Sequence, residues 1–282
     1  MKYFEKVPAV LLLEDGTVFH GKSAGKIGTT TGEVCFNTSM TGYQEVFTDP
    51  SYFGQVLVMT NAHIGNYGAF DEDEESSSVK ISGLVVKNFT NLFSRQMADS
   101  SIQEYLLEQN VIAISDVDTR ALVRHIRSKG AMNCIISSET TDIEDLKARL
   151  AKVPSMEGLE LASQVSTKEA YDFGPEDADK KLAVLDVGVK RNILRSFAQR
   201  GVRMRVFPAK TKLEEMEAWG PDGFFISNGP GDPASMDYAV ETVKGILNKN
   251  YPIFGICLGH QLDRKSTRLN SSHANISYAV FC

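Results

Sequence analysis

Short apolar runs separated by polar turns dominate the first half of the chain. Two capping patterns for helices follow the early runs: Ser101 with Glu104 before residues 102–109, and Asp118 before a helix that stops at Gly130. Asp142 opens a third predicted helix, which reaches about residue 152. Strands with scattered helices favour an α+β domain over residues 1–153. The predicted strands are residues 10–13, 33–37, 55–60, 81–86, 111–114 and 132–136.

The pattern changes twice in the second half. Residues 154–181 carry several glycines and prolines and a polar run but no period, so we predict a linker there. From residue 182, strands at 182–186, 202–207, 223–227 and 252–256 alternate with helices at 190–200, 212–219 and 235–248. Such alternation predicts a mostly parallel sheet with right-handed crossovers, whose chemistry gathers at the carboxyl ends of the strands. The chain is therefore expected to be an α/β protein.

Composition and charge exclude several classes of protein. The net charge is −6, with 30 basic and 36 acidic residues and no basic block, so nucleic acid is not an expected partner. No apolar run exceeds about five residues, whereas a membrane helix needs about twenty. The four cysteines form no CxxC pair, which argues against a zinc site or a disulfide framework. The acidic run at residues 71–75 is interpreted as a solvated loop, and no metal site is predicted. These features together favour a cytoplasmic protein.

One cysteine lies in a pattern that is typical of a nucleophile. Cys257 follows a predicted strand, precedes a predicted helix and is flanked at two positions by Gly255 and Gly259. Small neighbours permit the sharp turn of a nucleophile elbow. The positive end of the helix dipole favours the thiolate there, and the amide of Leu258 is placed to donate to an oxyanion. The alternative is a buried core cysteine, which is the more common role of an isolated one.

A second loop follows a strand of the same predicted sheet. Residues 227–233 read SNGPGDP, and a rigid, glycine-rich turn of this kind can present N–H groups to an anion. The alternative is a plain connecting turn capped by Asp232 or Ser235. Both loops follow strands of one parallel sheet, so we expect them at the same sheet edge.

These motifs resemble known families. GICLGHQ at residues 255–261 together with SNGPGDP is similar to the class I glutamine amidotransferases. Residues 36–45 (FNTSMTGYQE), 48–52 (TDPSY), 63–66 (HIGN), 116–120 (DVDTR) and 188–192 (GVKRN) resemble the small subunit of carbamoyl-phosphate synthetase. The likeness runs over residues 1–262, which makes residues 182–262 an incomplete amidotransferase domain.

The resemblance implies an activity and a site. It implies that Cys257 attacks the side-chain amide of glutamine, releases ammonia and holds a glutamyl thioester that water cleaves. Ammonia then passes to a large partner subunit, which makes carbamoyl phosphate from ATP and bicarbonate for pyrimidine and arginine synthesis. ATP and metal ions are expected on that subunit and no cofactor on this chain. The implied glutamine-binding residues are Ser51, Gly229, Gly231, Leu258 and Gln261; without the resemblance, Ser51 is interpreted as a turn or cap residue.

Two departures from the family pattern affect the expected activity. The family uses a His and a Glu well downstream of the cysteine, and none of His20, His63, His125, His260 or His273 matches that position. Residues 263–282 resemble a translated sequencing-library adapter, so we expect a non-native tail; a divergent natural tail is the alternative. The chain as it stands is therefore expected not to turn over glutamine. A non-catalytic docking subunit is the second hypothesis, although it has no use for the elbow, and an unrelated cysteine hydrolase is the third.

Overall fold

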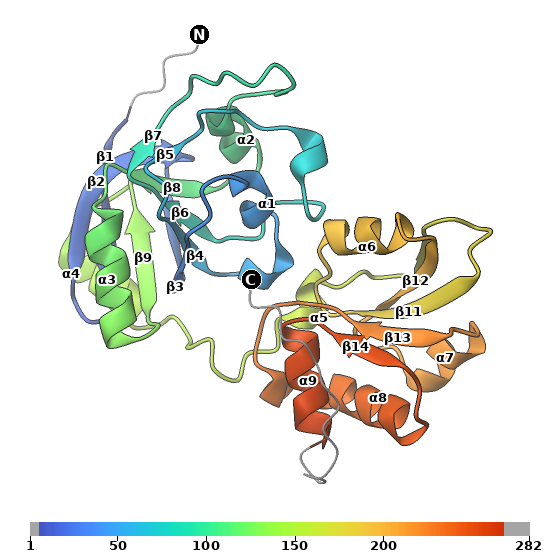
Figure 1. Cartoon of the computed structure of the whole chain (residues 1–282). Coiled ribbons are helices and arrows are strands. Elements are labelled where there is room, and N and C mark those ends of the chain that lie inside the picture. Colours follow the sequence, from blue (N-terminus) through green and yellow to red (C-terminus); the bar gives the residue numbers. More distant parts are fainter. Residues whose placement is uncertain (1–5, 268–282) are drawn as a thin grey trace. The chain divides into compact units, whose positions relative to one another are not determined.

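The computed structural model describes residues 6–267 and divides the chain into two compact units, Met1–Ser155 and Met156–Cys282. No helix in residues 6–267 is long and apolar enough to cross a membrane. Each unit has its own sheet and its own apolar clusters (Figure 1). The α/β fold class is confirmed, with a mostly parallel sheet in the second unit.

A seven-stranded closed barrel forms the centre of unit 1, in the order β1-β2-β8-β6-β4-β3-β9. Strands β3, β4, β6 and β8 run parallel to one another, whereas the pairs β1-β2, β2-β8, β1-β9 and β3-β9 are antiparallel. The barrel strands are β1 (Pro8–Leu13), β2 (Val18–Gly25), β3 (Thr29–Asn37), β4 (Val56–Met59), β6 (Gly83–Val85), β8 (Ile112–Ser115) and β9 (Asn133–Ser137).

Four helices and a small sheet complete unit 1. The helices are α1 (Tyr43–Phe47), α2 (Ile102–Glu108), α3 (Thr119–Lys129) and α4 (Ile143–Leu150), and β5 (His63–Ile64) pairs with β7 (Asn88–Phe89). The predicted caps are confirmed: Ser101 and Glu104 form a capping box, and Asp118 and Asp142 accept backbone N–H groups of α3 and α4. Two 3₁₀ turns lie at Pro50–Tyr52 and Asp71–Asp73.

Strand β1 shows why an unbroken apolar run can be a strand here. Ala9, Leu11 and Leu13 join an apolar cluster with residues of β3, β4, β6, β8 and β9, whereas Val10 and Leu12 pack with α4. Both faces of β1 are therefore covered, and alternation with polar residues is not required. Strand β2 is not predictable from local pattern, because its residues VFHGKSAG carry little apolar periodicity.

Unit 2 holds a five-stranded sheet in the order β10-β12-β11-β13-β14. Four strands are parallel, and β10 pairs antiparallel with β12 at one edge. The strands are β10 (Tyr171–Phe173), β11 (Lys180–Asp186), β12 (Val202–Pro208), β13 (Gly223–Ile226) and β14 (Ile253–Gly255). The helices are α5 (Ala162–Val165), α6 (Arg191–Ala198), α7 (Leu213–Ala218), α8 (Asp237–Asn248) and α9 (Leu258–Thr267), with a 3₁₀ turn at Pro233–Ser235.

Helices cover both faces of this sheet, as Figure 1 shows. Helix α6 packs its Leu194 and Phe197 against Val206 and Phe225 on one face. On the other face α7, α8 and α9 pack with Leu185, Phe224 and other residues of β11 and β13. This three-layer arrangement fixes the carboxyl ends of β11, β13 and β14 at one edge, and the loops that follow those ends can build a site.

One boundary expected from the sequence was wrong. Residues 154–181 are not a linker, because they contain α5 and β10, and Leu161 and Ala162 are buried in unit 2. The segment was misread because its contacts are non-local and give no period. Helix α9 continues past Leu262 to Thr267, and Ser266 Oγ donates to the Leu262 carbonyl. The non-native origin of the residues from 263 onward stays a prediction. Residues 268–282 of the predicted non-native tail lie outside the described residues.

Glu45 carries a charge in an unfavourable place. It lies in α1, and its Oε2 atom has no hydrogen-bond partner in the part of the chain that the structure describes. Burial raises the pKa of this carboxyl, and the carboxylates of Asp73 and Glu75 raise it further. A carboxyl whose folded pKa lies above its unfolded pKa destabilises the fold once pH rises past the unfolded value.

We therefore expect Glu45→Gln to stabilise the protein at pH 7 by roughly 0.5 kcal/mol, a figure reduced because solvent still reaches part of the side chain. The gain should vanish near pH 4, where the carboxyl is largely protonated in both states. Urea unfolding at the two pH values measures it. Glu108→Gln, an exposed change on α2, is the matched control and should leave stability unchanged. An equal gain at both pH values would contradict the explanation.

Candidate active site

Cys257 occupies a strained turn between β14 and α9. Its φ is +51°, in the left-handed region that residues with a side chain seldom adopt, and the residue is exposed. The backbone N–H of Gln261 donates to the Cys257 carbonyl at 3.0 Å, which is the first hydrogen bond of the helix. A non-glycine residue held in this conformation beside a helix N-terminus is typical of a nucleophile elbow.

The two flanking glycines are required by close backbone packing. A Cβ on Gly255 would lie 2.6 Å from the carbonyl carbon of Gly259, in the first turn of α9. A Cβ on Gly259 would lie 2.2 Å from the carbonyl oxygen of Ile226, at the end of β13. Gly259 also donates its N–H to the carbonyls of Ser227 and Ile256. The helix thus begins directly on the neighbouring strand, which fixes the position of the thiol.

The loop after β13 lies against this turn. A Cβ on Gly229 would come within 1.8 Å of the Val187 carbonyl oxygen and 3.2 Å of a Leu258 methyl group. The buried Ser227 hydroxyl accepts from the Val187 N–H and donates to the Asn228 carbonyl. The two loops therefore lie at the same sheet edge, as the sequence predicted.

Gly231 is held by residues 158–161, which lie within the predicted linker. Its φ is +96°, and a Cβ there would lie 3.0 Å from the Leu159 carbonyl oxygen and 3.1 Å from the Leu161 nitrogen. The Asp232 N–H donates to the Leu159 carbonyl, and the Asp232 carboxylate accepts from the Gly158 N–H. Residues 158–161 thus support the loop that carries Gly229 and Gly231.

Asp186 organises the third loop of this edge, and the sequence analysis did not single it out. It is buried at the end of β11, where its carboxylate accepts from the N–H groups of Gly188, Val189 and Thr167 at 2.7–2.9 Å. Asn228 accepts from the Lys190 N–H and ties this loop to the next one. A charged residue at the end of an apolar strand was the available signal.

The other two cysteines among residues 6–267 are less exposed than Cys257. Cys134 is fully buried in the barrel, and burial raises the pKa of its thiol far above the usual value. Burial, with the Glu33 charge adding, raises the pKa of Cys35 to about 12. Neither thiol ionises near neutral pH, so Cys257 is the exposed reactive candidate among residues 6–267.

We expect iodoacetamide at pH 8 to label Cys257 at least about 100-fold faster than Cys35 or Cys134, because only thiolates react. Peptide mass spectrometry over a time course, in native buffer and in urea, measures the three rates. The urea arm is the control, since unfolding should make them similar. Equal labelling in native buffer would contradict the assignment.

Comparison with known proteins decides the family. Residues 11–136 match the model for the carbamoyl-phosphate synthase small chain, CPSase domain, and residues 183–266 match that for class-I glutamine amidotransferase. The carbamoyl phosphate synthase small chain of Vibrio vulnificus is 44% identical over 293 residues, covering 96% of this chain and 77% of the relative. The chain belongs to the carbamoyl phosphate synthase small-chain family. The small chain of Synechococcus sp. is 46% identical over 274 residues (93% and 70% covered), and that of Chlorobaculum tepidum 44% over 283 (98% and 77% covered).

Five of the six predicted site residues of this small-chain family member lie in unit 2, at the sheet edge described above. Leu258 begins α9 next to the thiol, and Gln261 is exposed one turn further on. Ser51 is the sixth and lies in unit 1, in the 3₁₀ turn Pro50–Tyr52, where the Asp49 carboxylate accepts from its N–H. In residues 6–267 no group of three or more His, Cys, Asp or Glu side chains is arranged to hold a metal ion.

Proposed function

We propose that this chain is the glutamine-hydrolysing subunit of a carbamoyl phosphate synthase, with Cys257 as its nucleophile. The observation that carries the proposal is the exposed thiol on a left-handed turn at the start of α9, beside the glycine-rich loop of residues 227–233. Membership of the small-chain family and the class-I amidotransferase match of residues 183–266 support it.

The chemistry is an acyl transfer in two steps. The Cys257 thiolate adds to the carbonyl carbon of the glutamine side chain, and the oxygen becomes an oxyanion. We assign the donor to that oxygen to the backbone N–H of Leu258, in the first turn of α9, where N–H groups have no acceptor within the helix. The oxyanion then re-forms the carbonyl and the C–N bond breaks. The nitrogen takes up the proton that the thiol lost on ionising and leaves as ammonia, and a glutamyl thioester remains. Water adds to the thioester, the C–S bond breaks, glutamate is released and the thiol is regenerated.

The substrate contacts follow from the same loops. We assign Gly229 and Gly231 to the backbone cradle for glutamine and Gln261 to a polar contact from α9. The family resemblance also assigns Ser51 to glutamine binding. Ammonia serves a large partner subunit, which holds the ATP and metal ions, and residues 1–153 supply docking surface for it. The complex is assigned to the cytoplasm.

A glutamine analogue that alkylates thiols tests the glutamine site directly. A diazoketone analogue of glutamine should modify Cys257 in a 1:1 ratio, and free glutamine should slow the reaction. Mass spectrometry locates the label, and the matching analogue of alanine, which lacks the side-chain amide, is the control. Modification that glutamine does not slow would favour the second hypothesis, a docking subunit without a glutamine site.

A further inference from the structure

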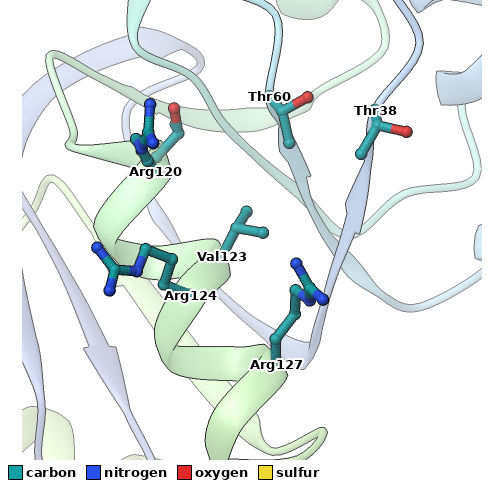
Figure 2. A pocket seen from close by; sticks show the side chains of 7 residues that line it. Thr38, Thr60, Arg120, Val123, Arg124 and Arg127 are labelled. Carbon is teal, nitrogen blue, oxygen red and sulfur yellow. The ribbon is translucent and has the colours of Figure 1, made fainter.

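A cavity of about 520 Å³ lies in unit 1, far in sequence from the cysteine turn. It opens between α3 and the ends of two parallel barrel strands, since Thr38 directly follows β3 and Thr60 directly follows β4. Its lining also includes Thr119, Arg120, Val123, Arg124 and Arg127, all from α3 (Figure 2).

The three arginines share one face of α3. Their spacing of four and then three residues places them one above another, and in Figure 2 Arg120 and Arg127 lie at the two ends of the row. The opposite face of the helix is buried through Leu122 and Ile126. Because its apolar face packs against the barrel, the helix turns the face with the three guanidinium groups toward the cavity.

None of these three arginines forms an ion pair with a carboxylate of residues 6–267. Other arginines of the chain do: Arg95 pairs with Asp73, and Arg149 pairs with Asp145 at 2.8 Å. The chain is acidic, with six more acidic than basic residues, so carboxylates are abundant. Three like charges in one row repel one another, and an anion between them relieves that repulsion.

We propose that this cavity binds a small phosphate-bearing anion with more than one negative charge. Guanidinium groups match phosphate oxygens with paired N–H donors, and the polar residues Thr38 and Thr60 line the same cavity. The N-terminal turn of α3, which begins at Thr119, adds positive potential near Arg120. The volume is within the usual range for small-molecule sites. The site is independent of the proposed glutamine hydrolysis.

A protein segment rich in carboxylates is the other ligand that arginines attract. The cavity favours the small anion because its charges come from a single helix face and its remaining walls from two strand ends, which form a short recess. An acidic segment of a partner would require a groove that extends along the surface.

Isothermal titration calorimetry with inorganic pyrophosphate, at low and at moderate salt, tests the proposal on the whole chain. Wild type should bind, and Arg127→Gln should weaken binding about 10-fold or more, as expected for the loss of a charge-assisted hydrogen bond. The triple change of Arg120, Arg124 and Arg127 to Gln should abolish it, and the same triple change to Lys should retain part of it. Arg149→Gln on α4 is the matched control and should leave the affinity within twofold.

Parallel titrations with inorganic phosphate and with ATP distinguish a single phosphate from a polyphosphate ligand. Circular dichroism of each variant verifies folding, which we expect to be intact because the three side chains are exposed. Failure of pyrophosphate, phosphate and ATP alike to bind the wild type, or equal binding by the Gln triple variant, would overturn the proposal. If the Gln triple variant instead loses affinity for the purified large subunit while none of these anions binds, the cavity receives an acidic protein segment. Labelling of Cys257 by the glutamine analogue should be the same in all of these variants. Failure of the anion proposal would therefore leave the proposed glutamine site untouched.

Discussion

Replacing Cys257 by Ser is expected to reduce glutamine-dependent carbamoyl phosphate synthesis at least ~1000-fold, because a serine hydroxyl stays protonated at neutral pH and is a far weaker nucleophile. The change is made in a version extended to the length of the curated relatives and assayed with the large subunit. Ammonia supplied directly is the control, and synthesis from it should be unchanged. The side chain is exposed on its turn, so the fold should be retained.

Hydrolysis of glutamine by the serine variant at the parental rate would remove Cys257 from the mechanism. A parallel loss of ammonia-dependent synthesis would instead indicate that the substitution disturbs assembly with the large subunit. The two readouts therefore separate chemistry at the thiol from docking.

The largest effect on stability is expected for Gly259→Ala. The new Cβ would lie 2.2 Å from the Ile226 carbonyl oxygen and 2.8 Å from that of Ser227, and both are backbone atoms of a buried strand end. Helix α9 must move away, at a cost of about 2–3 kcal/mol. Because Cys257 begins this helix, alkylation of its thiol by the glutamine analogue should also slow. Urea unfolding and the labelling rate measure the two effects.

Gly245→Ala in α8 is the matched control in the same unit. Its Cβ would lie 2.7 Å from a Leu213 methyl group, the flexible end of a side chain that can rotate. Alanine is also the better helix former, by about 1 kcal/mol, so this variant should be as stable as the parent or more stable. Equal destabilisation of the two variants would show that backbone contact at Gly259 is not the cause.

Local signals made much of this fold predictable. The caps Ser101, Asp118 and Asp142 act through side-chain bonds to N–H groups two or three residues away, so the sequence alone contains them. The cysteine turn was likewise predictable from the sequence, because its glycines and the preceding strand are adjacent in sequence. In both cases the interaction that creates the structure spans only a few residues.

The features that were missed depend on distant residues. Strand β10 exists because Tyr171–Phe173 pairs with residues 204–206, and the segment around Leu159 is ordered by contacts with Gly231 and Asp232. Asp186 accepts from Thr167, nineteen residues earlier in the chain. Closure of the barrel also joins strands that no local pattern links. A period along the chain carries no information about such partners.

Closure of the barrel has a consequence during synthesis on the ribosome. Residues 10–13 of β1 pair with residues 134–137 of β9, and β3 pairs with β9 as well. At about 5–20 residues per second, the apolar segment of β1 emerges roughly 6–25 s before its partner strand is made. During that interval Val10–Leu13 has an unpaired edge and no cover, the condition in which nascent chains aggregate. Newly made protein should therefore depend on chaperones that shield this first strand until β9 emerges.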